Sequence, residues 1–296
     1  MGKRDRALAA LVLAASWAVC APAAADGFAM ESPRSQAGAE DSILLARPGG
    51  FRSGRWTAQL STDYARDPLA VRDGPTIISN RTVATAGTTY GLSEHLALAL
   101  MFPYVLHQRI DETAARAGPL QLDAAGPGDL RLHARVLLAR SDQGLAWGAT
   151  VDWLLPTGSE AALASDGEAA SGVATQLSYD TQGVTIAADV GLEFGAGVPL
   201  DQATPATDLR CGLGLFREFG SLRLGLEFAG RTGLQGDRFL RARFSPARLA
   251  LSGRMAFDRL WVVLAPAMGL VAEAPGTPLF RVLLHVGGVL YEGDAR

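Results

Sequence analysis

Apolar and polar residues alternate with a period of two along most of the chain after residue 53. In one segment Leu130, Leu132 and Ala134 share a face, and Arg131 and His133 occupy the opposite face. Successive side chains of a β-strand point to opposite sides of the sheet. The pattern therefore predicts strands whose two faces meet different surroundings.

The same alternation defines roughly 12 segments of about 10 residues, the length with which a tilted strand crosses the hydrocarbon layer of a membrane. The segments span residues 54–66, 81–91, 95–106, 128–140, 144–156, 171–179, 183–195, 207–219, 221–231, 247–257, 259–271 and 279–291. After the first 25 residues no run reaches the roughly 18 apolar residues of a spanning helix. The apolar content is thus expected in strands.

The connections between these segments distinguish a membrane barrel from a soluble barrel, which alternation alone would also suit. The short turn at 91–94 lies between the long loops 66–81 and 107–127, and long and short connections continue to alternate. Short periplasmic turns and longer external loops are typical of outer-membrane barrels. We therefore predict an all-β, transmembrane, antiparallel up-and-down β-barrel over residues 54–296, surrounded by outer-membrane lipid.

Charged and histidine side chains fall opposite the apolar rows. A charge on the lipid face would cost roughly 2 to 4 kcal/mol at mid-membrane, so we expect these side chains to line the lumen. The lumen-lining candidates are Arg131, His133, Arg135, Asp152, Asp189, Glu193, Arg210, Arg223, Glu227, Arg254, Arg281 and His285. Their mixed signs predict cross-strand pairs such as Glu193 with Arg210. These side chains could form a salt-bridged interior, a selectivity filter, or both.

Aromatic residues near the segment ends are expected in girdles at the two membrane interfaces. Trp56 and Tyr64 share the outward face of the first segment, and Trp261 lies near the start of a later one. Aromatic rings at such positions support the membrane assignment.

The amino-terminal residues predict export. Lys3, Arg4 and Arg6 precede an apolar stretch over 7–19 and small residues that end at Ala25, which is the layout of a secretory signal peptide over residues 1–25. A lipoprotein signal ending at Cys20 is the rival interpretation, although the residues before that cysteine match it poorly. Residues 26–53 have no clear period and several Gly and Pro residues, so we expect a loosely ordered N-terminal leader.

Composition and motifs argue against several classes of function. The formal net charge is -3, and no basic stripe that could follow phosphates is present, so nucleic acid is not an expected partner. None of the 4 histidines has the spacing of a metal ligand with another His, Cys or acid pair. We therefore expect no catalytic residues, metal or cofactor, and a protein that is not an enzyme.

Three short motifs carry a family resemblance: YGLSEHLALAL from Tyr90, GPGDLRL from Gly126 and LPTG from Leu155. In this order they resemble the outer-membrane barrel family named for transport in the meta pathway of phenol degradation. They are also similar to the barrel part of some OmpA-like proteins. The resemblance implies passive uptake of small hydrophobic or aromatic solutes.

Three functional hypotheses follow. The resemblance implies uptake of a hydrophobic or aromatic solute, and the charged inner row suggests a narrow, weakly selective channel for small polar solutes. The third is a non-conducting structural or surface-exposed barrel. The sequence does not choose between them and leaves the solute and the oligomeric state open.

Overall fold

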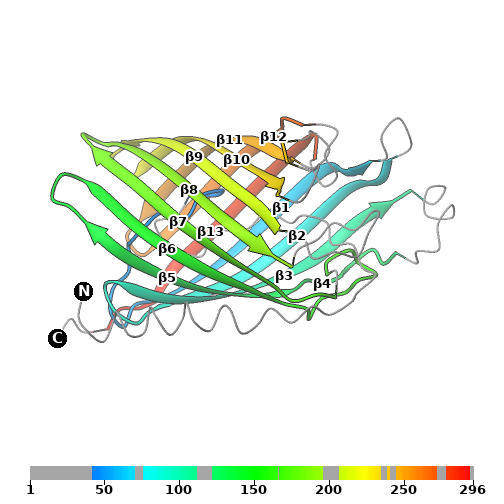
Figure 1. Ribbon diagram of the computed structural model, residues 1–296, viewed down its shortest axis with the longest axis horizontal. Helices are drawn as coiled ribbons and strands as arrows, with labels where there is room; N and C mark the ends of the chain where they lie inside the picture. Colours follow the sequence, from blue (N-terminus) through cyan, green and yellow to red (C-terminus); the bar gives the residue numbers. More distant parts are fainter. Residues whose placement is uncertain are drawn as a thin grey trace.

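The predicted barrel is confirmed by a computed structural model, which describes residues 42–70, 76–111, 122–165, 167–195, 207–234, 239–240, 245–271 and 278–293. Within these residues 12 long antiparallel strands form one closed barrel, and the two-residue β4 adds to the edge of β3 (Figure 1). The strands are β1 (Trp56–Ala70), β2 (Thr76–Gly91), β3 (Leu96–Ile110), β4 (Gly126–Pro127), β5 (Leu130–Arg140), β6 (Leu145–Leu155), β7 (Ala170–Thr181), β8 (Val184–Phe194), β9 (Thr207–Phe219), β10 (Leu222–Gly233), β11 (Ala247–Phe257), β12 (Leu260–Gly269) and β13 (Phe280–Tyr291).

The barrel closes where the first long strand meets the last. Residues 56–66 of β1 pair in antiparallel register with residues 280–291 of β13. Elsewhere each long strand pairs with its neighbours in the chain, and β3 passes directly to β5. The up-and-down order expected from the alternating connections is therefore the order of the sheet.

Tight turns join the strands at one end of the barrel. Between β7 and β8, Gln182 and Gly183 have φ values of 45° and 76°. Two successive residues with positive φ form the mirror-image hairpin turn, whose twist matches the right-handed twist of paired strands. A two-residue connection can therefore return the chain without splaying the sheet.

The first three strands are longer than the alternation predicted. They have 15, 16 and 15 residues, and in Figure 1 they reach beyond their neighbours at the end that carries the long connections. Register shifts interrupt the pairing between Arg66 and Leu69 and between Ile78 and Asn80. Each irregularity breaks the two-residue period, which explains why the sequence pattern ended the first strand early and began the second late.

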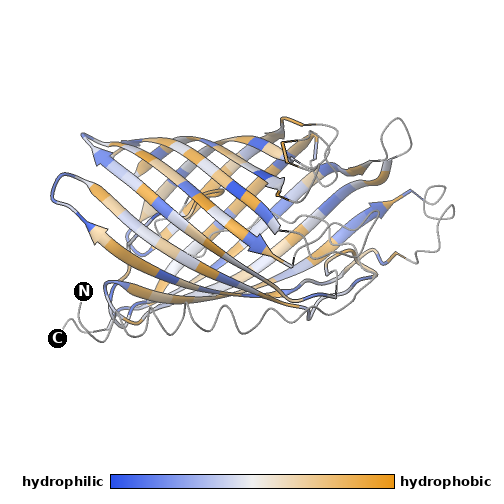
Figure 2. Ribbon diagram, in the orientation of Figure 1, coloured by the Kyte–Doolittle hydropathy of each residue, from blue (hydrophilic) through white to orange (hydrophobic). Residues whose placement is uncertain are grey.

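The two faces of the sheet differ as the alternation requires. On β3, Leu98, Leu100 and Phe102 point outward and are exposed, whereas Ala99 and Met101 point inward and are buried. Figure 2 shows the resulting alternation of hydrophobic and hydrophilic residues along the strands. An apolar outer face of this kind suits lipid. None of the described residues forms a helix long and apolar enough to span a membrane.

The outward orientation that the girdle prediction requires is confirmed for two aromatic residues and wrong for a third. Trp56 and Tyr64 point outward, with exposures of 46% and 42%, and Trp56 makes an edge contact with Tyr90. Trp261 instead points into the lumen and is 4% exposed. Both faces of β12 are apolar, so the alternation there could not show which face meets lipid. Gly287 on β13 leaves room for the indole, because a Cβ at that position would overlap its ring.

The chain just before β1 does not lie outside the barrel. Of the expected leader, residues 26–41 and the predicted signal peptide lie outside the described residues. Residues 42–49 are all buried, and Figure 1 shows this blue segment inside the barrel. The expectation of a loosely ordered leader before the fold therefore does not describe residues 42–49, whose burial depends on the surrounding wall.

A charge placed on the outer face should destabilise the barrel according to its depth. We expect Leu226→Arg, in the middle of β10, to lower the free energy of unfolding in lipid by about 2 to 4 kcal/mol. Leu260→Arg, beside a tight turn, is the matched control with about 0 to 1 kcal/mol. Denaturant titration in liposomes measures both, and equal losses would contradict a lipid-facing Leu226.

Candidate functional site in the barrel lumen

The inner wall carries polar side chains from most of the barrel. The structure places the twelve candidates on inward positions of β5, β6, β8, β9, β10, β11 and β13. His133, Arg135, Asp152, Glu193, Glu227, Arg281 and His285 are buried. Arg210 and Arg223 keep side-chain exposures of 18% and 12%, and Arg131, Asp189 and Arg254 lie on the same face. The candidates are therefore spread around the lumen rather than gathered in one centre.

One ionic cluster spans the five neighbouring strands β5 to β9 and draws side chains from four of them. Nδ1 of His133 lies 2.6 Å from Oδ1 of Asp152, and the guanidinium of Arg210 donates to Oδ2 of the same carboxylate at 2.8 Å. Arg210 also lies 3.5 Å from a carboxylate oxygen of Glu193, so the predicted pair between these two residues is confirmed. Charge-assisted hydrogen bonds of this kind hold the side chains in place.

A glycine makes this cluster possible. Asp152 and Glu193 stand on β6 and β8, and both are in register with Gly172 of the intervening strand β7. A Cβ at Gly172 would come within 3.6 Å of both acidic side chains. That distance is an ordinary van der Waals contact, whereas a Cβ at Gly191 of β8, which is in register with Arg210, would lie 2.7 Å from Nε of Arg210. Because Gly191 carries no side chain, Arg210 on β9 can reach across β8 to Asp152.

A second polar group lies towards the end with the long connections. Arg281 on β13 pairs with Asp63 on β1 at 3.1 Å. Arg81 on β2 donates to the side-chain oxygen of Gln108 at 3.3 Å and to the carbonyl of Leu163 at 3.1 Å. Asp63, Arg81 and Gln108 were not among the candidates. Asp63 could have been predicted, because it is adjacent to the outward Tyr64 on the same strand and therefore points inward.

The connection between β6 and β7 folds into this mouth of the barrel. Ala162 and Leu163 are buried, and Leu163 packs against Leu69 and Ile78. Asp129, just before β5, accepts a hydrogen bond from the backbone N–H of Gly158 at 2.9 Å, and burial raises the pKa of its carboxyl group. The loop thus narrows the entrance at the end with the long connections.

Residues 42–50 narrow the other half of the lumen. The backbone N–H of Leu44 donates to Oε2 of Glu227 at 2.8 Å. Arg47 pairs with Asp180 at 2.9 Å, and its carbonyl accepts a hydrogen bond from Arg135 at 2.7 Å. Asp180 precedes the tight turn at Gln182, so this segment crosses the half of the barrel that carries the tight turns.

An apolar strip of the inner wall receives the segment. Ile43 and Leu44 belong to one buried cluster with residues of β11, β12 and β13, and Leu45 packs with Ala187 and Phe216. The wall residues of the first cluster are Ala250, Trp261, Val263, Ala265, Ala267 and Leu283. None of these wall residues was among the predicted lumen-lining candidates.

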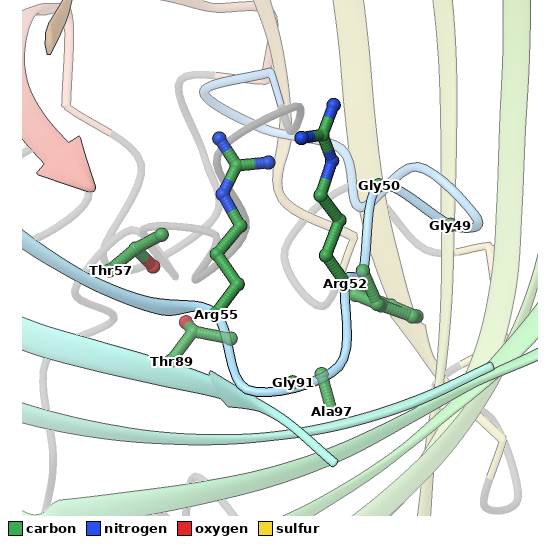
Figure 3. Close-up of a pocket in the computed structure, with 9 residues that line it drawn as sticks. Gly49, Gly50, Arg52, Arg55, Thr57, Thr89, Gly91 and Ala97 are labelled. Atoms are coloured by element: carbon green, nitrogen blue, oxygen red, sulfur yellow. The ribbon is translucent and has the colours of Figure 1, made fainter. Parts of the chain in front are cut away.

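A small pocket lies between the segment and β1 to β3. Arg52 and Arg55 point the same way beside it (Figure 3), and both approach Glu292, at 2.9 and 3.7 Å. Its lining comprises Gly49, Gly50, Phe51, Arg52, Arg55, Thr57, Thr89, Gly91 and Ala97. In the described part of the chain no three His, Cys, Asp or Glu side chains gather as metal ligands.

Comparison of the sequence with protein-family models and with curated proteins finds no match. The fold, in contrast, resembles solved outer-membrane proteins. An outer membrane channel from Pseudomonas putida F1 has a TM-score of 0.66 at 15% identity, covering 83% of this chain and 100% of the channel. The NanC porin has a TM-score of 0.53 at 9% identity, covering 79% of this chain and 100% of the porin. These likenesses place the fold among outer-membrane β-barrels, and the link to phenol degradation stays a prediction.

Removal of the arginine from the ionic cluster should destabilise the barrel. Arg210→Met leaves Asp152 and Glu193 without their shared cation, and the loss of one partner of a buried pair costs about 3 kcal/mol or more. Arg217→Met, an exposed arginine on the same strand, is the control and should have little effect. The temperature at which the folded band disappears on an unboiled gel compares them. Equal temperatures would show that the cluster does not hold the wall together.

Proposed function

We propose that the protein is a passive channel of the outer membrane that admits small polar solutes. The observation that supports this proposal best is the charged inner wall of a closed barrel, which offers hydrogen-bonding partners to water and to solutes. The Asp152 cluster draws on strands between β5 and β9 and the Asp63 pair on β1 and β13, so polar groups are spread around the wall of the lumen.

The two inward-folded segments limit what such a channel can pass. Residues 159–165 narrow the external mouth, and residues 42–50 occupy the half with the tight turns. A barrel of about 12 strands has a narrow interior even before these segments are added. We therefore infer a cut-off at small solutes.

An apolar or aromatic solute is the second candidate, favoured by the strip around Trp261 and Val263. This strip gives the lumen one apolar side, while charged and neutral polar side chains stand elsewhere on the inner wall. A strain lacking the protein should then take up a dilute aromatic substrate more slowly than the parent strain. Equal uptake rates would exclude this candidate.

Conductance and liposome swelling test the channel directly. We expect the purified protein to produce current in planar bilayers and to let amino acids and monosaccharides swell liposomes faster than trisaccharides. Folding is checked beforehand by the shift of the band between boiled and unboiled samples. A folded barrel that gives neither current nor swelling would support the non-conducting structural role instead.

A further inference from the structure

We propose that residues 42–50, here called the plug, form a movable gate that closes the lumen in the state described and opens it by withdrawing. This inference rests on the proposed channel function and assigns a regulation to it. The plug is defined by its burial against the wall of the half with the tight turns, where it contacts β5, β7, β8, β10 and the apolar strip.

The wall is shaped to receive the plug. Gly212 and Gly214 take inward positions on β9, and a Cβ at either would overlap the methyl groups of Leu45. Gly148 on β6 has the same relation to Pro48, because a Cβ there would lie 2.9 Å from its ring. Glycines at three inward positions therefore leave the space that the plug fills, which indicates a specific seat.

The plug is nevertheless held differently from the strands. No strand of the barrel pairs with residues 42–50 by a backbone ladder in the described part of the chain. Its polar links to the wall include those at Glu227, Asp180 and Arg135, and its apolar side chains pack against the apolar strip and against Ala187 and Phe216. Withdrawal would thus leave every strand pairing of the barrel intact.

A hinge lies at the end of the plug. Gly49 and Gly50 have φ values of 95° and 77°, which side chains with a Cβ rarely adopt. Four residues later the N–H of Gly54 donates to the carbonyl of Gly91 at 2.8 Å, which fixes the chain to the tight turn before β3. Both hinge glycines line the pocket in Figure 3. The chain can therefore bend between a fixed base and a removable plug.

Reversible cross-linking tests the movement. We pair Leu45→Cys with Ala187→Cys in a Cys211→Ser background, because Leu45 and Ala187 pack in one cluster and Cys211 is the one native thiol outside the predicted signal peptide. A short, cleavable bis-thiol reagent ties the plug to β8 in the membrane-inserted full chain. We expect the open-channel current of the double-cysteine variant to fall at least tenfold on cross-linking and to return on reduction. The same reagent should leave the current of each single-cysteine variant unchanged.

Deletion of residues 42–48, which keeps the hinge glycines, is the second variant and should raise the conductance several-fold. Current that is unchanged by cross-linking, or by the deletion, would overturn the gate while leaving the channel in place. If the wild-type barrel never conducts but the deletion variant does, the plug is a permanent obstruction, and this result would also overturn the gate. If neither the folded wild-type barrel nor the folded deletion variant conducts, the proposed channel function itself is overturned.

Discussion

The closing ladder between β1 and β13 is the constraint on which the rest of the structure depends. A backbone N–H or C=O in hydrocarbon finds no water, and each unpaired group costs several kcal/mol. Closure pairs Trp56 through Arg66 with the last strand, so no strand edge faces lipid. Once the sheet is closed it has an outside and an inside, and the alternation of side chains becomes a division between lipid and lumen.

That division explains why so many ionic groups are tolerated within one sheet. Asp152 and Glu193 could not stand on the outer face without the depth-dependent penalty of lipid. On the inner face they share Arg210, and Gly191 leaves the space that the side chain of this arginine occupies. A glycine with no visible role in the strand pattern thus determines which charges can meet.

The strand order could be predicted from the sequence because long and short connections alternate. The orientation of Trp56 and Tyr64 and the Glu193 to Arg210 pair could be predicted because each follows from the two-residue period. It could not give the full lengths of β1 and β2, since shifts near Arg66 and Ile78 break that period. Trp261 was assigned to the wrong face because apolar residues occupy both sides of β12. The position of residues 42–49 was missed for another reason. A segment buried on all sides by other strands carries no periodic signature of its own.

The apolar strip and the plug account for each other. An apolar inner surface in a water-filled channel would be exposed at a cost of about 25 cal/mol for each Å². Ile43 and Leu44 cover this surface, and the N–H of Leu44 donates to Oε2 of Glu227, which is fully buried beside it. The same arrangement sets the cost of opening, because withdrawal exposes the strip and leaves Glu227 to water or to an entering solute. A solute with an apolar body and a hydrogen-bond donor would compensate for both losses. The chemistry of the apolar strip and of Glu227 therefore indicates the chemistry of a solute that could pass through the lumen.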